Sequence, residues 1–190
     1  MAELVQRALI PSLWLTWLAY WIVAARTVKS ARRSESVRSH ASYMVPLIAG
    51  GALLAWQHAP GLLGTRFVAP GPVPCFMGAA VLAAGLALAA WARHHLGANW
   101  SGTVTLKQDH ELIRTGPYAI VRHPIYAGLL AAVLGTAIAF GEWRGLVALA
   151  LFAIAFVRKI GIEERLMREG FPEQYARYRA EVPALIPLIY

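Results

Sequence analysis

Five apolar stretches, separated by shorter polar segments, constrain this chain more than any other feature of its sequence. They cover residues 8–25, 43–58, 73–91, 125–140 and 146–157. A bilayer core about 30 Å thick is crossed by a helix of roughly 20 apolar residues, and a helix pairs its backbone polar groups within the segment. Charged residues make up only 15% of the chain, against about 25% in soluble domains. The sequence therefore predicts an all-α, polytopic membrane helical bundle with about five transmembrane helices.

The last two apolar stretches are separated only by residues 141–145, and this short connection predicts a helical hairpin. No internal repeat or low-complexity linker divides the chain, so we expect a single integral membrane domain over residues 1–190. Within this domain, residues 1–92 are expected to hold three N-terminal spans. Residues 93–190 are expected to hold a polar loop, the helical hairpin and a C-terminal tail.

Basic residues are distributed unequally between the two ends of the predicted bundle. Of the 18 Lys and Arg residues, all but Arg7, Arg66 and Arg144 lie in the first loop, the third loop or the tail. Cytoplasmic segments hold the excess of Lys and Arg in membrane proteins. The sequence therefore predicts an N-terminus outside and a cytoplasmic third loop and tail. Its Ala, Arg and Gly content favours a prokaryotic inner membrane.

The net charge of +8 arises from short basic segments between long apolar runs, rather than from one solvated patch. This pattern favours anionic lipid over nucleic acid as the partner of the basic residues. The single cysteine, Cys75, excludes an internal disulfide. No Cys and His residues stand at zinc-finger spacing, so no metal site is expected.

The third loop and the start of the fourth apolar stretch concentrate polar and aromatic side chains. Gly116-Pro117 predicts a turn, and Pro124 suits the first turn of a helix, which places His123 at its start. Such residues are typical of interfacial anchors and of the aromatic belt at span ends. Their density also fits a segment folded over a polar ligand. The residues concerned are His110, Tyr118, Arg122, His123 and Tyr126, and Thr103 could line the same pocket.

Two acidic residues, Glu163 and Glu164, follow Arg158 and Lys159 by about one helical turn. Lys159 and Glu163 have the spacing of an ordinary surface pair, worth only about 0.2–0.5 kcal/mol. The alternative is that an acid binds the ammonium end of a zwitterionic ligand while a cation meets an anionic group of a second substrate. The rest of the tail predicts an amphipathic helix and then an extended segment on the membrane surface.

From about residue 96 to residue 187, the chain resembles the isoprenylcysteine carboxyl methyltransferase family and, more loosely, the phospholipid N-methyltransferases. The motifs that carry the resemblance are H-E-L-I at 110–113, G-P-Y at 116–118, R-H-P-I-Y at 122–126, E-E at 163–164 and F-P-E-Q-Y-A-R-Y at 171–178. The ordered set is far more specific than any single motif. The first two apolar stretches carry no signature of the family.

The resemblance implies a helical membrane bundle that encloses S-adenosylmethionine between the cytoplasmic loop and the tail. Glu163 would hold the ammonium group of this cofactor. The acceptor side would be formed by Lys159, Arg158 and Arg122. The implied cofactor-binding residues are Thr103, His110, Glu111, Leu112, Ile113, Gly116, Tyr118, His123, Pro124, Ile125, Tyr126, Glu163 and Glu164.

The chain departs from the family pattern at two positions. Lys159 stands where the eukaryotic enzymes have an arginine implicated in contacting the substrate, and lysine lacks the bidentate fork that suits a carboxylate. Phe171-Pro172 replaces a common Phe-Gly, which affects a turn in the tail. The Gly-x-Gly element of the phospholipid methyltransferases does not precede the third loop, and its absence favours the carboxyl methyltransferase branch.

The resulting hypothesis is a methyltransferase that acts on a lipidic or isoprenoid-like acceptor. A carboxylate or thiolate acceptor needs no general base, whereas an amine would need one, such as His123 or a glutamate. Two other classes also fit parts of the sequence. One is a sterol-reductase-like NADPH oxidoreductase, whose C-terminal region has similar Tyr and Arg-His-Pro elements, and the other is a non-catalytic lipid-binding protein.

Overall fold

Long helices dominate the computed structural model, which describes residues 1–26, 31–34, 36–56, 58–97, 100, 105–107 and 112–187. The long helices are α2 (Ile10–Ala24), α3 (Val37–Ala55), α4 (Pro72–Leu96), α5 (Pro124–Phe140) and α6 (Trp143–Gly170). The shorter ones are α1 (Ala2–Leu4), η1 (Val5–Leu9), η2 (Gly61–Gly64), η4 (Gly116–Ala119) and α7 (Pro172–Glu181). The segments Ala2–Ala24, Pro72–Leu96 and Trp143–Gly170 are long and apolar enough to cross a membrane, and Pro124–Phe140 is a shorter apolar helix. The predicted helical membrane bundle is therefore confirmed.

Each predicted apolar stretch forms a helix, but several boundaries differ from the prediction, two of them most informatively. Helix α3 begins at Val37 because Ser36 caps it, with the Ser36 hydroxyl accepting a hydrogen bond from the Ser39 amide at 3.2 Å. Helix α6 continues past the end of its apolar stretch to Gly170. A helix is limited by its backbone hydrogen bonds and caps, not by the point at which its side chains become polar. The carboxylates of the tail therefore stand on the same rigid helix as the last span.

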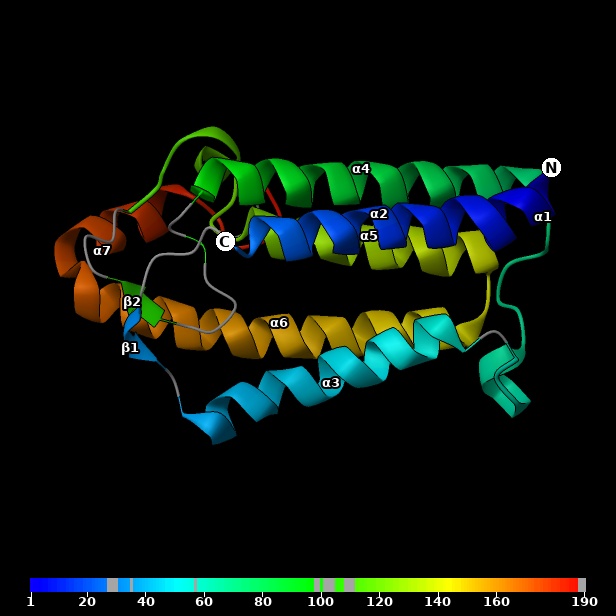
Figure 1. Cartoon of the computed structure of the whole chain (residues 1–190), viewed down its shortest axis with the longest axis horizontal. Helices are drawn as coiled ribbons and strands as arrows, with labels where there is room; N and C mark the ends of the chain where they lie inside the picture. Colours follow the sequence, from blue (N-terminus) through cyan, green and yellow to red (C-terminus); the bar gives the residue numbers. More distant parts are fainter. Residues whose placement is uncertain are drawn as a thin grey trace.

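A short antiparallel sheet joins the first loop to the third, which the prediction of an all-α chain did not include. Strand β1 (Ala31–Ser34) pairs with β2 (Thr105–Lys107), with Ser34 opposite Thr105. The sheet lies at the same end of the bundle as α7 (Figure 1). This end also holds the C-terminus of α4 and the N-terminus of α5.

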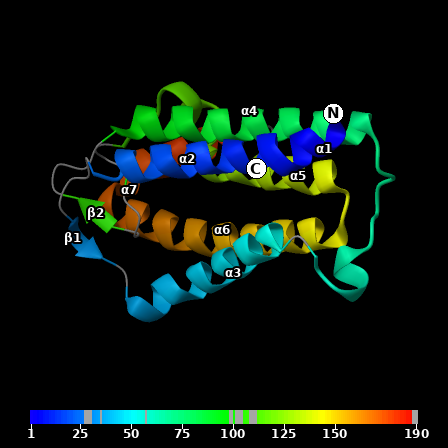
Figure 2. The ribbon, with the colours of Figure 1, turned by 45° about the vertical axis from the view of Figure 1, so that its right-hand side comes forward.

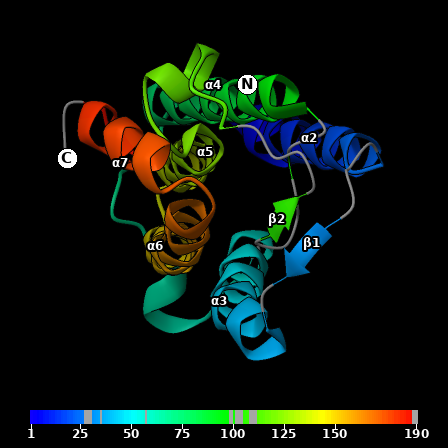
Figure 3. The same cartoon turned by 90° about the vertical axis from the view of Figure 1, so that its left-hand side faces the viewer.

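The helices form two groups that run along the same axis (Figures 2 and 3). One group contains α2, α4 and α5, and the other contains α3 and α6. Helix α4 packs most extensively against α5, and α3 against α6. The predicted hairpin of α5 and α6 is present, and its turn uses Gly141 in the left-handed region at φ 66°. The arms of the hairpin therefore belong to different groups.

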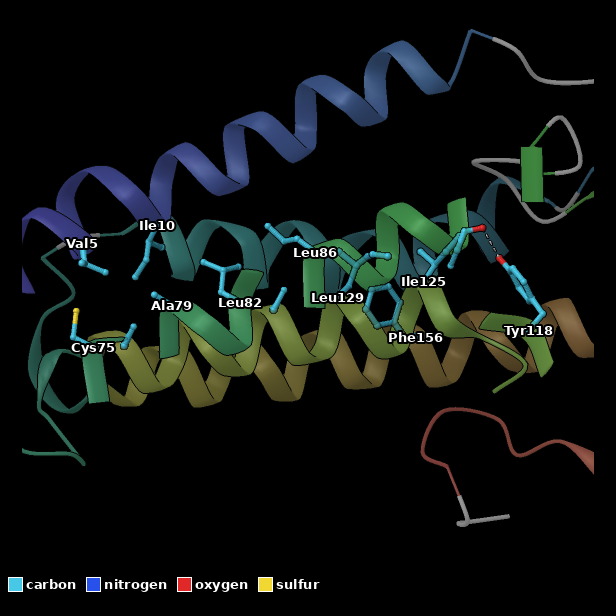
Figure 4. Packing of buried hydrophobic residues seen from close by; sticks show 14 residues of the cluster. Val5, Ile10, Cys75, Ala79, Leu82, Leu86, Tyr118, Ile125, Leu129 and Phe156 are labelled. Atoms are coloured by element: carbon cyan, nitrogen blue, oxygen red, sulfur yellow. Dashed lines mark hydrogen bonds between the residues drawn. The ribbon is translucent and has the colours of Figure 1, made fainter. Parts of the chain in front are cut away.

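The core of the larger group is built from the first helical segment, α4 and α5 (Figure 4). Leu82 is fully buried and lies among side chains that include Ile10 and Leu129. Two polar contacts fix the first segment to α5: the Trp14 indole donates to the Thr136 hydroxyl at 3.1 Å, and Gln6 donates to a backbone carbonyl of α5 at 2.6 Å. At the far end of the bundle, buried Arg144 donates to carbonyls at the end of α3.

Glycines allow the backbones of α4 and α5 to approach each other closely. A methyl group added to Gly85 would lie 2.5 Å from the Gly128 carbonyl oxygen, and one added to Gly128 would lie equally close to the Gly85 carbonyl. Gly78 and Gly135 repeat this arrangement one heptad along each helix. Small residues are how membrane helices gain the van der Waals contact that holds them together.

Replacing Gly85 by Ala is expected to destabilise the protein by about 1–3 kcal/mol, because the added methyl group meets backbone that has no room to move. Gly51→Ala is the matched control, since its methyl group meets nothing within 4 Å. This control is expected to be neutral or stabilising by up to about 1 kcal/mol. Thermal unfolding of the detergent-purified variants tests the prediction, which equal melting temperatures for the two variants would contradict.

Candidate active site

The C-terminal segment is fixed to the start of α5 by backbone hydrogen bonds. The amides of Arg122 and His123 donate to the carbonyls of Pro183 and Ala184 at 2.8 and 3.0 Å. The Tyr178 hydroxyl of α7 donates to the backbone carbonyl of Tyr118 at 2.6 Å. The predicted tail helix is therefore confirmed as α7, and the bent segment after it covers the end of the bundle at which α5 begins.

A buried ion pair joins the start of α5 to α6. The Arg122 guanidinium donates to one Glu164 carboxylate oxygen from Nε at 3.1 Å and from Nη2 at 2.8 Å. Its Nη1 donates to the backbone carbonyls of Arg179 and Val182. The Arg122 and Glu164 side chains are only 8% and 9% exposed. A single guanidinium thus holds α5, α6 and the C-terminal segment together.

His123 lies between the two acidic side chains of α6. Its Nδ1 is 3.4 Å from Glu163 Oε2, and its Nε2 is 3.4 Å from Glu164 Oε1. Burial alone would lower the pKa of His123, but the hydrogen bonds and negative charges of the two carboxylates outweigh it and raise the pKa above its ordinary value. Because both ring nitrogens face carboxylates, the doubly protonated imidazolium is the form that satisfies them.

Glu163 stands beside a stack of aromatic rings. The Tyr126 hydroxyl donates to Glu163 Oε1. The Tyr126 ring stacks on Phe156, with centroids 4.7 Å apart, and on His123, with centroids 5.7 Å apart. The result is a carboxylate at the edge of an aromatic surface, a combination suited to a cationic ligand.

The two adjacent cations of α6 have different surroundings. The Lys159 ammonium lies over the rings of Tyr43 and Tyr126, at 5.0 and 5.7 Å from their centroids. Arg158 is exposed and donates to the Ser42 hydroxyl at 3.2 Å. Successive residues of a helix point about 100° apart, so only Lys159 faces the aromatic surface beside Glu163.

The loop before α5 is held against the end of α4. Gly116 has φ 59°, and a side chain there would meet the His95 ring at 2.8 Å. His95 Nε2 forms a hydrogen bond with the Thr115 hydroxyl at 2.8 Å. The buried Tyr118 hydroxyl donates to the Ala92 carbonyl at 3.4 Å, and burial raises the pKa of Tyr118. The turn predicted at Gly116-Pro117 is confirmed as η4.

The family model described as phospholipid methyltransferase matches residues 73–174, which is more than half of the chain. The chain belongs to this family. This membership and the curated relatives confirm the resemblance seen in the sequence. The apolar helices and the solved relative described below support an integral membrane protein.

Among the curated relatives of this phospholipid methyltransferase family member is the protein-S-isoprenylcysteine O-methyltransferase of Schizosaccharomyces pombe. It is 37% identical over 99 residues, which are 49% of this chain and 41% of the relative. The cobalt-zinc-cadmium resistance protein CzcN of Cupriavidus metallidurans is 33% identical over 82 residues, which are 43% of this chain and 38% of the relative.

The solved eukaryotic intramembrane Ras methyltransferase, an isoprenylcysteine carboxyl methyltransferase, matches with a TM-score of 0.53 and 26% identity. The match covers 80% of this chain and 50% of that structure. The chain therefore spans half, or less, of the length of these relatives.

The structure brings part of the predicted site of this family member together. Five of the predicted residues lie side by side: Glu163, Glu164, His123, Tyr126 and Lys159. Other predicted cofactor residues pack into hydrophobic clusters: Leu112 against Tyr175 and Tyr178, Ile113 against the core, and Pro124 and Ile125 within the core. Thr103, His110 and Glu111 lie outside the described residues. The described residues contain no group of three His, Cys, Asp or Glu side chains that could hold a metal ion.

Sequence reasoning missed the contribution of α3. Tyr43 is fully buried beneath Lys159, and its hydroxyl is 2.8 Å from His40 Nδ1. These two residues precede or begin an apolar stretch that carries no family motif. The available signal was local: a His and a Tyr three residues apart, at the end of a span on the predicted cytoplasmic side.

Proposed function

We propose that this chain is an integral membrane methyltransferase that uses S-adenosylmethionine and acts on the carboxylate of a lipidic or isoprenoid-like acceptor. The observation that carries the proposal is the position of Glu163, a family-motif carboxylate held by Tyr126 and His123 beside an aromatic stack. The family and the relatives named above favour this function over a reductase or a non-catalytic lipid-binding protein.

The side chains around Glu163 fit the two positively charged groups of S-adenosylmethionine, its ammonium and its sulfonium. Glu163 would bind the ammonium group. The stacked rings of Tyr126 and Phe156 would face the sulfonium, because aromatic faces attract cations. His123, whose two ring nitrogens face Glu163 and Glu164, would hold Glu163 in place for this contact.

When bound, this cofactor supplies an electrophilic methyl group, whose bond to sulfur breaks as an acceptor oxygen attacks, so that the sulfonium becomes a neutral thioether. The residues of the site then have to align the acceptor and exclude water. The tail performs the second task, because Val182 and Pro183 are buried against the start of α5. The ion pair of Arg122 and Glu164 fixes this cover, which favours a positioning role for Arg122.

The protonation of His123 favours a carboxylate acceptor over an amine. A base that accepts a proton from an amine must itself be unprotonated near the working pH. The raised pKa of His123 and its two carboxylate partners favour the protonated ring instead. A carboxylate is already the nucleophilic form at neutral pH and needs no base. Carboxyl methylation is therefore the reaction that needs no proton transfer to these side chains.

Calorimetric titration of the detergent-purified protein with S-adenosylmethionine and with its demethylated product tests the proposed function. We expect binding in the micromolar range, which corresponds to about 8 kcal/mol. Absence of binding to both compounds in a folded sample would overturn the proposal.

We also propose five membrane spans, with the N-terminus outside and the active site on the cytoplasmic side of a prokaryotic inner membrane. The distribution of Lys and Arg supports this orientation, since among the residues that the structure describes only Arg7, Arg66 and Arg144 lie away from the end that contains Glu163. The basic end would then contact both the cytoplasm, which supplies the cofactor, and the anionic inner leaflet.

Cysteine labelling tests this orientation, because the natural cysteine Cys75 is buried. Glu173→Cys places an exposed thiol on α7, and Leu62→Cys places one on η2 at the opposite end. A membrane-impermeant maleimide added to intact spheroplasts is expected to label Leu62→Cys but not Glu173→Cys. Inverted vesicles are expected to give the reverse result. Labelling of Glu173→Cys in spheroplasts and of Leu62→Cys in inverted vesicles would establish the opposite orientation.

A further inference from the structure

Helix α3, which carries no family motif, supplies a fully buried tyrosine to the active-site end of the bundle. Tyr43 packs in one buried cluster with Ala155 and Leu166 of α6. Its ring lies beneath the Lys159 ammonium at 5.0 Å, and its hydroxyl is 2.8 Å from His40 Nδ1. The contact between Tyr43 and Lys159 therefore joins α3 to α6, and the hydrogen bond with His40 holds the hydroxyl of Tyr43 in place.

The Lys159 ammonium lies between two aromatic rings. A lysine at the end of a span usually extends its flexible side chain toward water. Here the ammonium lies near the Tyr43 ring on α3 and the Tyr126 ring on α5, a geometry in which both ring faces attract the cation. The Tyr43 ring thereby restricts where the positive charge of Lys159 is held.

These contacts connect α3 to the carboxylate assigned to the cofactor. The Tyr126 ring lies beside the Lys159 ammonium, and the Tyr126 hydroxyl donates a hydrogen bond to Glu163. Lys159 and Glu163 therefore contact the same tyrosine, and they lie about one turn apart on α6. An anionic group bound by Lys159 would lie next to a methyl donor bound by Glu163, as methyl transfer requires.

We propose that Tyr43, held by His40, is a positioning residue that places the Lys159 ammonium to bind the carboxylate of the acceptor. The inference rests on the proposed function and adds to it a role for α3 and an anionic acceptor group. Tyr43 acts through Lys159 and not by touching the reacting atoms. Its removal is therefore expected to weaken acceptor binding and to leave cofactor binding intact.

Steady-state methyl transfer by the full chain in detergent tests this proposal, with N-acetyl-S-farnesylcysteine and palmitate as carboxylate acceptors. Tyr43→Leu is expected to raise the acceptor KM about 5- to 30-fold, since a partly buried cation–π contact is lost. Tyr43→Phe keeps the ring and loses the contact with His40, so a rise of only about twofold is expected. The Kd for S-adenosylmethionine is expected to stay within about twofold in both variants.

The decisive comparison is made in a Lys159→Met background. There, Tyr43→Leu is expected to change the acceptor KM by less than about twofold, because the cation that it positions is absent. Leu47→Ala is the structural control: Leu47 packs in the same interface one helical turn further along α3. It is expected to lower the melting temperature and to leave the acceptor KM unchanged.

Three outcomes would overturn the inference. The first is an unchanged acceptor KM in Tyr43→Leu, and the second is an equal increase with and without Lys159. The third is binding of S-adenosylmethionine by the unmodified chain without turnover of either carboxylate acceptor. Failure of the proposed function is distinct, because the unmodified chain would then not bind S-adenosylmethionine at all.

Discussion

Replacing Glu163 by Gln is expected to weaken the binding of S-adenosylmethionine about 30-fold or more. The substitution preserves the shape of the side chain and removes its negative charge. Glu163 is partly buried and already accepts a hydrogen bond from Tyr126, so little water is available to compensate. Loss of one partner of a desolvated charge pair typically costs about 2–5 kcal/mol. Calorimetric titration of the variant against the unmodified chain measures the effect.

Glu173→Gln makes the same chemical change on the exposed surface of α7 and serves as the control. Its affinity for S-adenosylmethionine is expected to match that of the unmodified chain. Equal affinity in Glu163→Gln would show that another group binds the ammonium. In that case, the cofactor assignment would stand and the role given to Glu163 would not.

Replacing Glu164 by Gln is expected to destabilise the protein by about 3–5 kcal/mol, because it leaves the buried Arg122 guanidinium without its counter-ion. Arg122 is 8% exposed and also holds the carbonyls of Arg179 and Val182. The expected result is a lowered melting temperature and earlier proteolysis of the C-terminal segment. Both are measured on the detergent-purified variant.

Two further variants separate the buried pair from an ordinary ion pair. Arg114→Gln breaks the pair with Glu181, whose side chains are 38% and 60% exposed, and is expected to cost less than about 1 kcal/mol. The double variant Arg122→Met/Glu164→Leu removes both buried charges and is expected to recover most of the stability lost in Glu164→Gln. A melting temperature for Glu164→Gln no lower than that for Arg114→Gln would contradict the structural role of the pair.

The positions of the helices could be predicted from the sequence because apolar residues are continuous in each of them. The lengths of α3 and α6 could not be predicted, because their backbone hydrogen bonds and caps extend beyond the apolar segment. The pairing of β1 with β2 was also missed. Such a pairing depends on two loops meeting in space, and neither loop has a strong strand pattern of its own.

The candidate site was likewise predicted only in part from the sequence. The motifs identified Glu163, Glu164, His123 and Tyr126 as candidates, and the structure places them in mutual contact. The roles of Thr103, His110 and Glu111 stay predictions, since these residues lie outside the described part of the chain. Tyr43 was not a candidate, because its partner Lys159 is more than one hundred positions away in the sequence.

The sequence by itself determined that this chain forms a membrane helical bundle and that its polar, motif-bearing residues share one end. Both follow from composition along the chain, which one-dimensional patterns record. Only the tertiary structure decided which face of α6 each charged residue occupies. Glu163 and Glu164 are neighbours in sequence, yet one meets Tyr126 and the other Arg122. Helical geometry turns adjacent side chains about 100° apart, and packing between helices selects their partners.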